Sequence, residues 1–174
     1  MSDRLLLPDQ APLFLLLYFL SAALALPLWT RLAARIGESR AWLSAMVLAV
    51  FAFLWTAQLD AGAMLPFGII CALTGAALGA DLALPPALLA GVIGSAGHGG
   101  EHEGSYFGLW SWITKMNLAL AAGISLPLLA WLGYTPGTTE AGAISALTLA
   151  YAILPCVLKT CAALVLWRAP LADI

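Results

Sequence analysis

Residues 73–115 read LTGAALGADLALPPALLAGVIGSAGHGGEHEGSYFGLWSWITK. The stretch contains two apolar runs, and each run holds one charged side chain in its interior, Asp81 in the first and Lys115 in the second. A Pro85-Pro86 pair and a loop rich in Gly, His and Glu lie between the two charges. Inside a membrane-spanning helix such a charge is expensive and by default indicates function. The first question is therefore whether these runs cross a membrane.

The composition answers that question. Of the 174 residues, 63% are hydrophobic and 9% are charged, against about 25% charged in an ordinary soluble domain. No charged residue occurs in five long runs, residues 10–30, 41–59, 61–80, 116–139 and 141–158. A helix needs about 20 apolar residues to cross a bilayer, and these runs have that length. The sequence therefore predicts an all-α integral membrane protein.

Other classes of protein find no support in the sequence. The seven Lys and Arg residues form no basic cluster, so nucleic-acid binding is not expected. Enzyme motifs such as a nucleophile elbow, a Gly-rich phosphate loop or HExxH do not occur. The loop around His98, Glu101, His102 and Glu103 is Gly-rich and does not preform four ligands. We therefore expect no enzyme, no bound metal and no cofactor.

We expect one membrane domain over residues 1–174, with spans at about 11–30, 41–59, 64–90, 105–132 and 143–167. In the first span, Ala23-Leu24-Ala25 has the form of a signal-peptide cleavage site. A signal peptide begins with a basic segment, however, whereas this chain has Asp3 and Asp9 there. The apolar run is also longer than usual for a signal peptide. A retained span is therefore the preferred interpretation.

The orientation follows from the loop between the first two spans, which carries Arg31, Arg35 and Arg40. Because basic loops stay in the cytoplasm, we expect the N-terminus outside and the C-terminus inside. Residues 61–97 leave an alternative, since they could form one long span or two short ones that turn near Asp81. One span keeps Arg168 on the same side as the loop arginines, which favours five spans over six.

Two local patterns concern the third span. Gly75 and Gly79 form a small-residue stripe that permits close helix packing. Pro85 and Pro86 remove two backbone donors, so we expect a kink or a break in that helix.

Four segments, taken in order, resemble a known family: PLWTRLAARIGESRAW (27–42), GADLALPPALLAGVI (79–93), EGSYFGLWSWITKMNLALAAG (103–123) and LLAWLGYTPG (128–137). They are similar to the C-terminal half of the glycoside-pentoside-hexuronide:cation symporters, the melibiose-permease-like branch of the major facilitator superfamily. The resemblance covers about residues 13–171. Its most specific feature is the spacing of twelve from Glu103 to Lys115, followed by the Leu-Gly-Tyr turn.

The resemblance implies a partial major-facilitator C-terminal bundle, with the five spans as the eighth to twelfth helices of a twelve-helix fold. It implies a secondary active sugar transporter in the inner (plasma) membrane, with sodium or a proton as the coupling ion of the full-length family. Lys115 would lie on the substrate and cation pathway, with Asn117 and Trp112 beside it. The implied partners are the lipid bilayer, a missing N-terminal half or another membrane subunit, and a sugar or glycoside.

The sequence also departs from the family pattern. Gly91 and Gly94 stand where the family carries acidic residues, and Gly99, Gly100 and His102 stand where it carries basic ones. Alternating access needs two bundles, so we expect a fragment, a split gene product or a decayed copy that does not transport alone. The alternative is a small structural or accessory membrane subunit.

The interior charges Asp81, Lys115 and Lys159 lie on three different predicted helices. Counted from the cytoplasmic ends, each is about 13–15 Å deep at 1.5 Å per residue. Pairing lowers the free-energy cost of burying charge in lipid, so we expect Asp81 to pair with one lysine. Lys159 is favoured, because the resemblance assigns Lys115 to the transport pathway.

Overall fold

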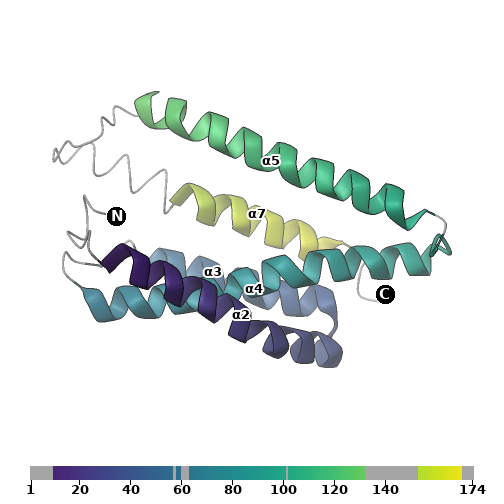
Figure 1. Ribbon diagram of the computed structural model, residues 1–174, viewed down its shortest axis with the longest axis horizontal. Helices are drawn as coiled ribbons and strands as arrows, with labels where there is room; N and C mark the ends of the chain where they lie inside the picture. The colour runs from purple at the N-terminus through teal and green to yellow at the C-terminus, as the bar shows by residue number, and fades with distance from the viewer. Residues whose placement is uncertain (1–9, 57, 60–62, 101, 132–152, 170–174) are drawn as a thin grey trace.

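The structure, a computed structural model, describes residues 10–56, 58–59, 63–100, 102–131 and 153–169. Over these residues it contains five helices, α2 (Ala11–Ile36), α3 (Glu38–Thr56), α4 (Met64–Ser95), α5 (Glu103–Trp131) and α7 (Leu154–Arg168). Figure 1 shows that consecutive helices run in opposite directions. Helices α2, α3 and α4 form a packed group, α7 lies beside α3, and α5 lies furthest from α2.

Among the described residues, α2, α3 and α4 are long and apolar enough to cross a membrane. This agrees with the predicted all-α membrane fold. Helices α5 and α7 coincide with the predicted fourth and fifth spans, but the beginning of the fifth lies among residues 132–152, outside the described part of the chain. The prediction of five membrane spans therefore stays a prediction.

The connection between α2 and α3 is shorter than expected. Helix α2 continues to Ile36 and α3 begins at Glu38, so the predicted loop containing Arg31, Arg35 and Arg40 is almost entirely helical. Gly37 alone makes the turn, with a φ of +89° that side chains with a Cβ rarely adopt. Its N–H donates to the carbonyl of Ala33, and its carbonyl accepts from the N–H of Ala41.

Helix α4 is the central element, and it contacts both α2 and α3 over much of its length. It has 32 residues, about 48 Å at 1.5 Å per residue, and its C-terminal part extends past the α2–α3 turn (Figure 1). Residues 61–97 therefore do not divide into two spans near Asp81. The loop that follows is accordingly shorter than predicted, because α5 already begins at Glu103.

For Pro85 and Pro86 we expected a kink or a break. The break is wrong, because α4 is helical from Met64 to Ser95 with both prolines inside it, and the kink stays a prediction. Because Pro85 and Pro86 have no N–H, the carbonyls of Asp81 and Leu82 lack their helical hydrogen bonds. The turns before and after this point keep their hydrogen bonds. Packing supports the interrupted turn, since Leu84 and Pro85 are buried and Leu84 belongs to one buried cluster with Ala41 and Ala45 of α3. Neighbouring helices commonly stabilise proline within membrane helices in this way.

The contact between α2 and α4 confirms the close packing predicted from the glycine stripe. A Cβ added at Gly75 would lie 2.2 Å from the carbonyl oxygen of Tyr18, and one added at Gly79 would lie 2.6 Å from that of Ala22. Only hydrogen fits in these two positions. The two backbones are so near that the indole Nε1 of Trp29 donates across the contact to the carbonyl of Ala76, at 2.7 Å.

Candidate transport site

Asp81 lies on α4 among the residues that face the centre of the bundle, next to the fully buried Ala80. Its Oδ1 accepts a hydrogen bond of 2.9 Å from Trp42 Nε1 of α3. Its Oδ2 accepts one from Lys159 Nζ of α7, so Asp81 and Lys159 form an ion pair. One carboxylate thus joins three helices through polar contacts. We refer to Asp81, Lys159 and Trp42 as the polar node.

The depth argument expected Asp81 to pair with one lysine, and the resemblance favoured Lys159; the structure brings Asp81 and Lys159 together. The depth itself needs correction, because it was counted from an end of α4 at Ala90, whereas the helix continues to Ser95. Trp42, which touches Asp81, lies only four residues after the start of α3, about 6 Å along that helix. Counted from Ser95, Asp81 lies about 21 Å from the end of α4, while the polar node lies close to the α2–α3 turn.

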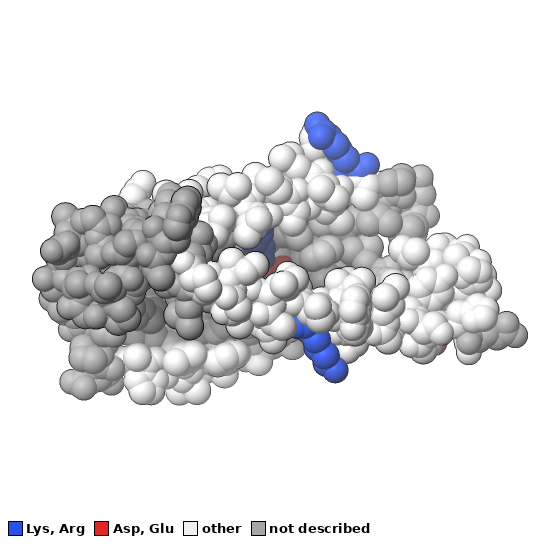
Figure 2. Space-filling model, turned by 90° about the horizontal axis from the view of Figure 1, so that it is seen from above, with Lys and Arg blue, Asp and Glu red and all other residues white. Residues whose placement is uncertain are grey.

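The polar node is only partly enclosed. The side chain of Lys159 is 24% exposed and that of Asp81 is 28% exposed. Figure 2 shows charged groups as rare on this face, with a blue group and a red group together in a recess between white atoms. The ion pair is therefore half-buried and is not sealed inside the bundle.

Sequence reasoning did not identify Trp42. A tryptophan near the end of a span usually indicates only the membrane interface. A buried or half-buried indole N–H also needs an acceptor, and inside lipid the acceptors are few. That requirement is the signal that could have linked Trp42 to the single carboxylate of the neighbouring span.

The three residues that the resemblance assigned to the substrate pathway, Trp112, Lys115 and Asn117, all lie on α5 and are exposed. Trp112 and Lys115 are three residues apart and therefore adjoin on one face of the helix. Asn117 is two residues further, about 200° around the helix from Lys115, so it does not share that face. Their part in a pathway stays a prediction.

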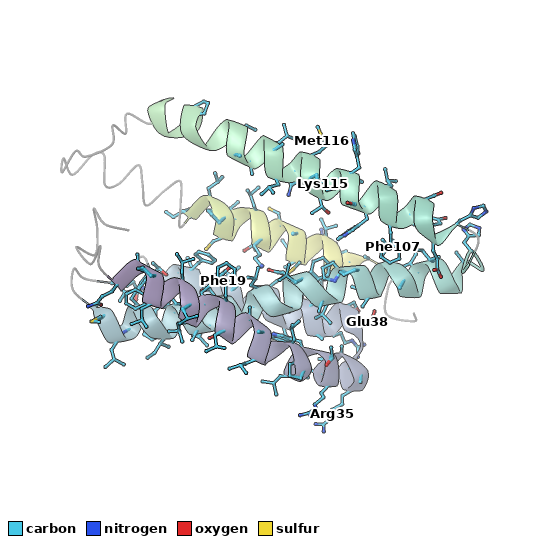
Figure 3. All side chains as sticks on the ribbon, in the orientation of Figure 1. Phe19, Arg35, Glu38, Phe107, Lys115 and Met116 are labelled. Carbon is cyan, nitrogen blue, oxygen red and sulfur yellow. The ribbon has the colours of Figure 1, made fainter. Side chains whose placement is uncertain are left out.

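Lys115 points from α5 toward the side where α7 lies, and Met116 points to the opposite side (Figure 3). Within the described ranges, no carboxylate lies within ion-pair distance of Lys115. Helix α5 contacts α4 only slightly, and apolar side chains along it such as Leu118 are widely exposed. Lys115 and Lys159 therefore have different surroundings, one open and one paired.

Four arginines gather at one end of the bundle. Arg31 and Arg35 lie in the last turns of α2, Arg40 lies in the first turn of α3, and Arg168 ends α7. Figure 1 shows the α2–α3 turn and the end of α7 at the same end of the molecule. A third segment that crosses the membrane only once requires this arrangement, because it keeps Arg168 on the same side as the other three arginines. The side of the membrane on which this end lies stays a prediction.

The loop between α4 and α5 is held by His98, whose Nδ1 lies 2.8 Å from Tyr106 Oη and whose ring stacks on that of Tyr106. His102 contacts the ring of His98 edge to face. The part of the loop that the structure describes, which leaves out Glu101, contains no group of three or more metal-ligating side chains. The contacts fasten the loop to the first turn of α5.

The polar node, an apolar helical bundle and an exposed lysine inside another long helix are features of a membrane transporter. The chain matches the family described as MFS/sugar transport protein over residues 7–173. No curated protein matches the chain. Because the family match covers nearly all of its 174 residues, the chain belongs to the MFS/sugar transport protein family.

Proposed function

We propose that this chain forms the C-terminal part of a sugar:cation symporter that carries a glycoside, a pentoside or a hexuronide. The family match over residues 7–173 is the observation that carries the proposal, since it assigns the chain to a family of sugar transport proteins. The finer assignment to the symporter branch rests on the resemblance of residues 103–123 and of the Leu-Gly-Tyr turn that follows them.

Lys115 and Trp112 are the residues that we propose contact the sugar. An ammonium group has three donors and can bind several sugar hydroxyls at once. The indole of Trp112, one turn away, offers a flat apolar surface against which the C–H face of a sugar ring can pack. Both side chains are exposed on α5, and the direction of Lys115 toward the side of α7 supports a pathway between these helices.

Transport by alternating access needs a second bundle that moves against the first. We propose that another polypeptide or a further segment supplies this bundle and packs against α5, whose apolar side chains are exposed. The complex would lie in the inner (plasma) membrane, with the four arginines of the α2–α3 turn and of α7 in the cytoplasm.

The test is sugar uptake by cells that lack their own carriers for these sugars. The chain is expressed alone and together with the product of any membrane-protein gene found directly upstream, and uptake of a labelled glycoside, pentoside and hexuronide is measured with and without a sodium or proton gradient. We expect gradient-dependent uptake only when both proteins are present. Lys115→Met should abolish it and Met116→Leu should not, since Met116 points away from α7. Absence of uptake, with the chain bound in an unrelated membrane complex, would support the accessory-subunit alternative.

A further inference from the structure

The arginines at the end of the bundle that contains the α2–α3 turn carry charge that the fold does not use. Arg31, Arg35, Arg40 and Arg168 are exposed, and within the described residues none of them forms an ion pair. Even Glu38, which begins α3 between Arg35 and Arg40 in the sequence, pairs with neither of them. We call these four arginines the arginine belt. Their charges are left for a group outside the described part of the chain.

The arginine belt does not form one compact pocket. Arg31 and Arg35 lie one turn apart on α2, whereas Arg168 ends α7, which packs against α3. Figure 2 shows two blue groups that project from opposite sides of the molecule, at nearly the same position along its long axis. A small free anion would meet one or two of these arginines, and a globular partner would cover one side of the bundle. An anionic layer that surrounds the bundle can bind all four.

Apolar side chains beside the arginine belt indicate where such a layer lies. Ile36 follows Arg35 and Trp167 precedes Arg168, and both apolar side chains are exposed. An arginine at the edge of a lipid layer places its carbon chain along apolar surface and its guanidinium among the headgroups, and an exposed tryptophan is typical of the same level. At the opposite end of the bundle, the first turns of α2, α4 and α7 and the last turns of α3 and α5 contain no lysine or arginine.

We propose that the arginine belt binds the headgroups of anionic phospholipids, such as phosphatidylglycerol, in the leaflet around this end of the bundle. A guanidinium group presents paired N–H donors that match two phosphate oxygens. The headgroup of a zwitterionic lipid carries its own cation, which competes for the phosphate, whereas an anionic headgroup has no such cation. Basic side chains near a membrane surface favour anionic lipid by roughly fivefold in affinity for each residue. The chain therefore selects the charge of the lipids that surround it.

The experiment counts the lipids bound to the purified full-length chain in a neutral detergent, by native mass spectrometry. Phosphatidylglycerol and phosphatidylcholine with the same acyl chains are titrated separately. We expect phosphatidylglycerol to half-saturate the chain at a concentration at least roughly tenfold lower, and the difference should shrink as ionic strength rises. Glycerol phosphate, which has the anionic group without acyl chains, should not displace the lipid. Displacement at equal concentration would identify a site for free phosphate and overturn the proposal.

Variants at the four positions test whether charge is the cause. Each Arg→Gln change should raise the half-saturating concentration of phosphatidylglycerol by roughly fivefold, and changing all four should abolish the preference. Lysine at the same four positions keeps the charge and should keep the preference. Lys115→Gln is the matched control, because it removes an exposed positive charge from α5 and leaves the arginine belt unchanged.

Three results would overturn the proposal. The wild-type chain could bind both lipids equally, which is also the result expected if the arginines contact an acidic surface of a second bundle. The preference could survive in the variant with four glutamines. It could also disappear in the lysine variant, which would indicate damage to the helix ends and not loss of charge. Lipid binding is measured on the chain alone and without sugar, so none of these results bears on the proposed transport of sugars.

Discussion

Gly75 of α4 lies directly against the backbone of Tyr18 of α2, so close that a Cβ atom at Gly75 would lie 2.2 Å from the Tyr18 carbonyl oxygen. No side-chain rotation can relieve that contact, because the backbone fixes the position of a Cβ atom and the Tyr18 oxygen belongs to the main chain. The two helices must therefore separate if Gly75 is replaced. This contact fixes the distance between α2 and α4, the pair of helices with the most extensive contact in the described bundle.

Gly75→Ala should destabilise the protein by about 1–3 kcal/mol, the usual effect of overpacking a core. Gly68→Ala is the matched control, because it lies on the same helix and also faces α2, but its Cβ would be 3.8 Å from Leu17 and Phe14. The free energy of unfolding in mixed micelles measures both variants. Equal stability of the two would show that α2 and α4 are not in backbone contact.

Asp81→Asn should cost about 2–3 kcal/mol of folding free energy, because it leaves the Lys159 ammonium without its partner in an apolar bundle. Adding Lys159→Met should restore most of that loss, since neither charge then remains. Unfolding in mixed micelles and the yield of monodisperse protein measure the difference. Lys115→Met serves as the control and should change stability little, because Lys115 is exposed. A double variant no more stable than Asp81→Asn would rule out the pair.

Trp42→Phe should cost about 1–2 kcal/mol, because it removes the N–H that donates to Asp81 and keeps an aromatic ring in the same space. Trp167→Phe is the control, since Trp167 is 69% exposed at the end of α7. In the Asp81→Asn background the effect of Trp42→Phe should shrink, because the acceptor is then a neutral amide. A double-mutant cycle of unfolding free energies measures this coupling. Strictly additive effects would indicate that the indole and the carboxylate do not interact.

Cysteines introduced at Arg35 and His98 should be labelled from the same side of the membrane, because the α2–α3 turn and the α4–α5 loop lie at one end of the bundle (Figure 1). The positive-inside rule makes that side the cytoplasm. The measurement uses a membrane-impermeant thiol reagent on cells and on inverted vesicles, in a background without the native cysteines. A third cysteine at Pro136 should be labelled from the outside. Labelling of positions 35 and 136 from one side would contradict the topology.

The sequence allowed much of this fold to be predicted, because membrane helices leave strong signals. Runs without charge gave the positions of the helices, and the spacing of Gly75 and Gly79 gave the close contact with α2. Counting residues along three spans brought Asp81, Lys115 and Lys159 to a similar depth, and the resemblance then favoured Lys159 as the partner of Asp81.

Other features depend on tertiary contacts that a pattern in one segment does not contain. The break expected at Pro85 and Pro86 does not occur, because burial of Leu84 against α3 supports the turn that the prolines weaken. The arginine-rich segment was interpreted as a loop, although a single glycine suffices to turn the chain. Trp42 was missed because its acceptor, Asp81, lies on a different helix and 39 residues away.

The proposal that α5 borders the sugar pathway is tested most directly by thiol labelling at Lys115, in membranes that contain the chain together with the polypeptide that supplies the second bundle. Lys115→Cys should react with a small water-soluble reagent, and a transported glycoside, pentoside or hexuronide should slow that reaction. Met116→Cys, on the opposite side of α5, should show no protection by sugar. A cysteine at position 115 that stays unreactive, or that reacts at the same rate with and without every sugar, would contradict the account.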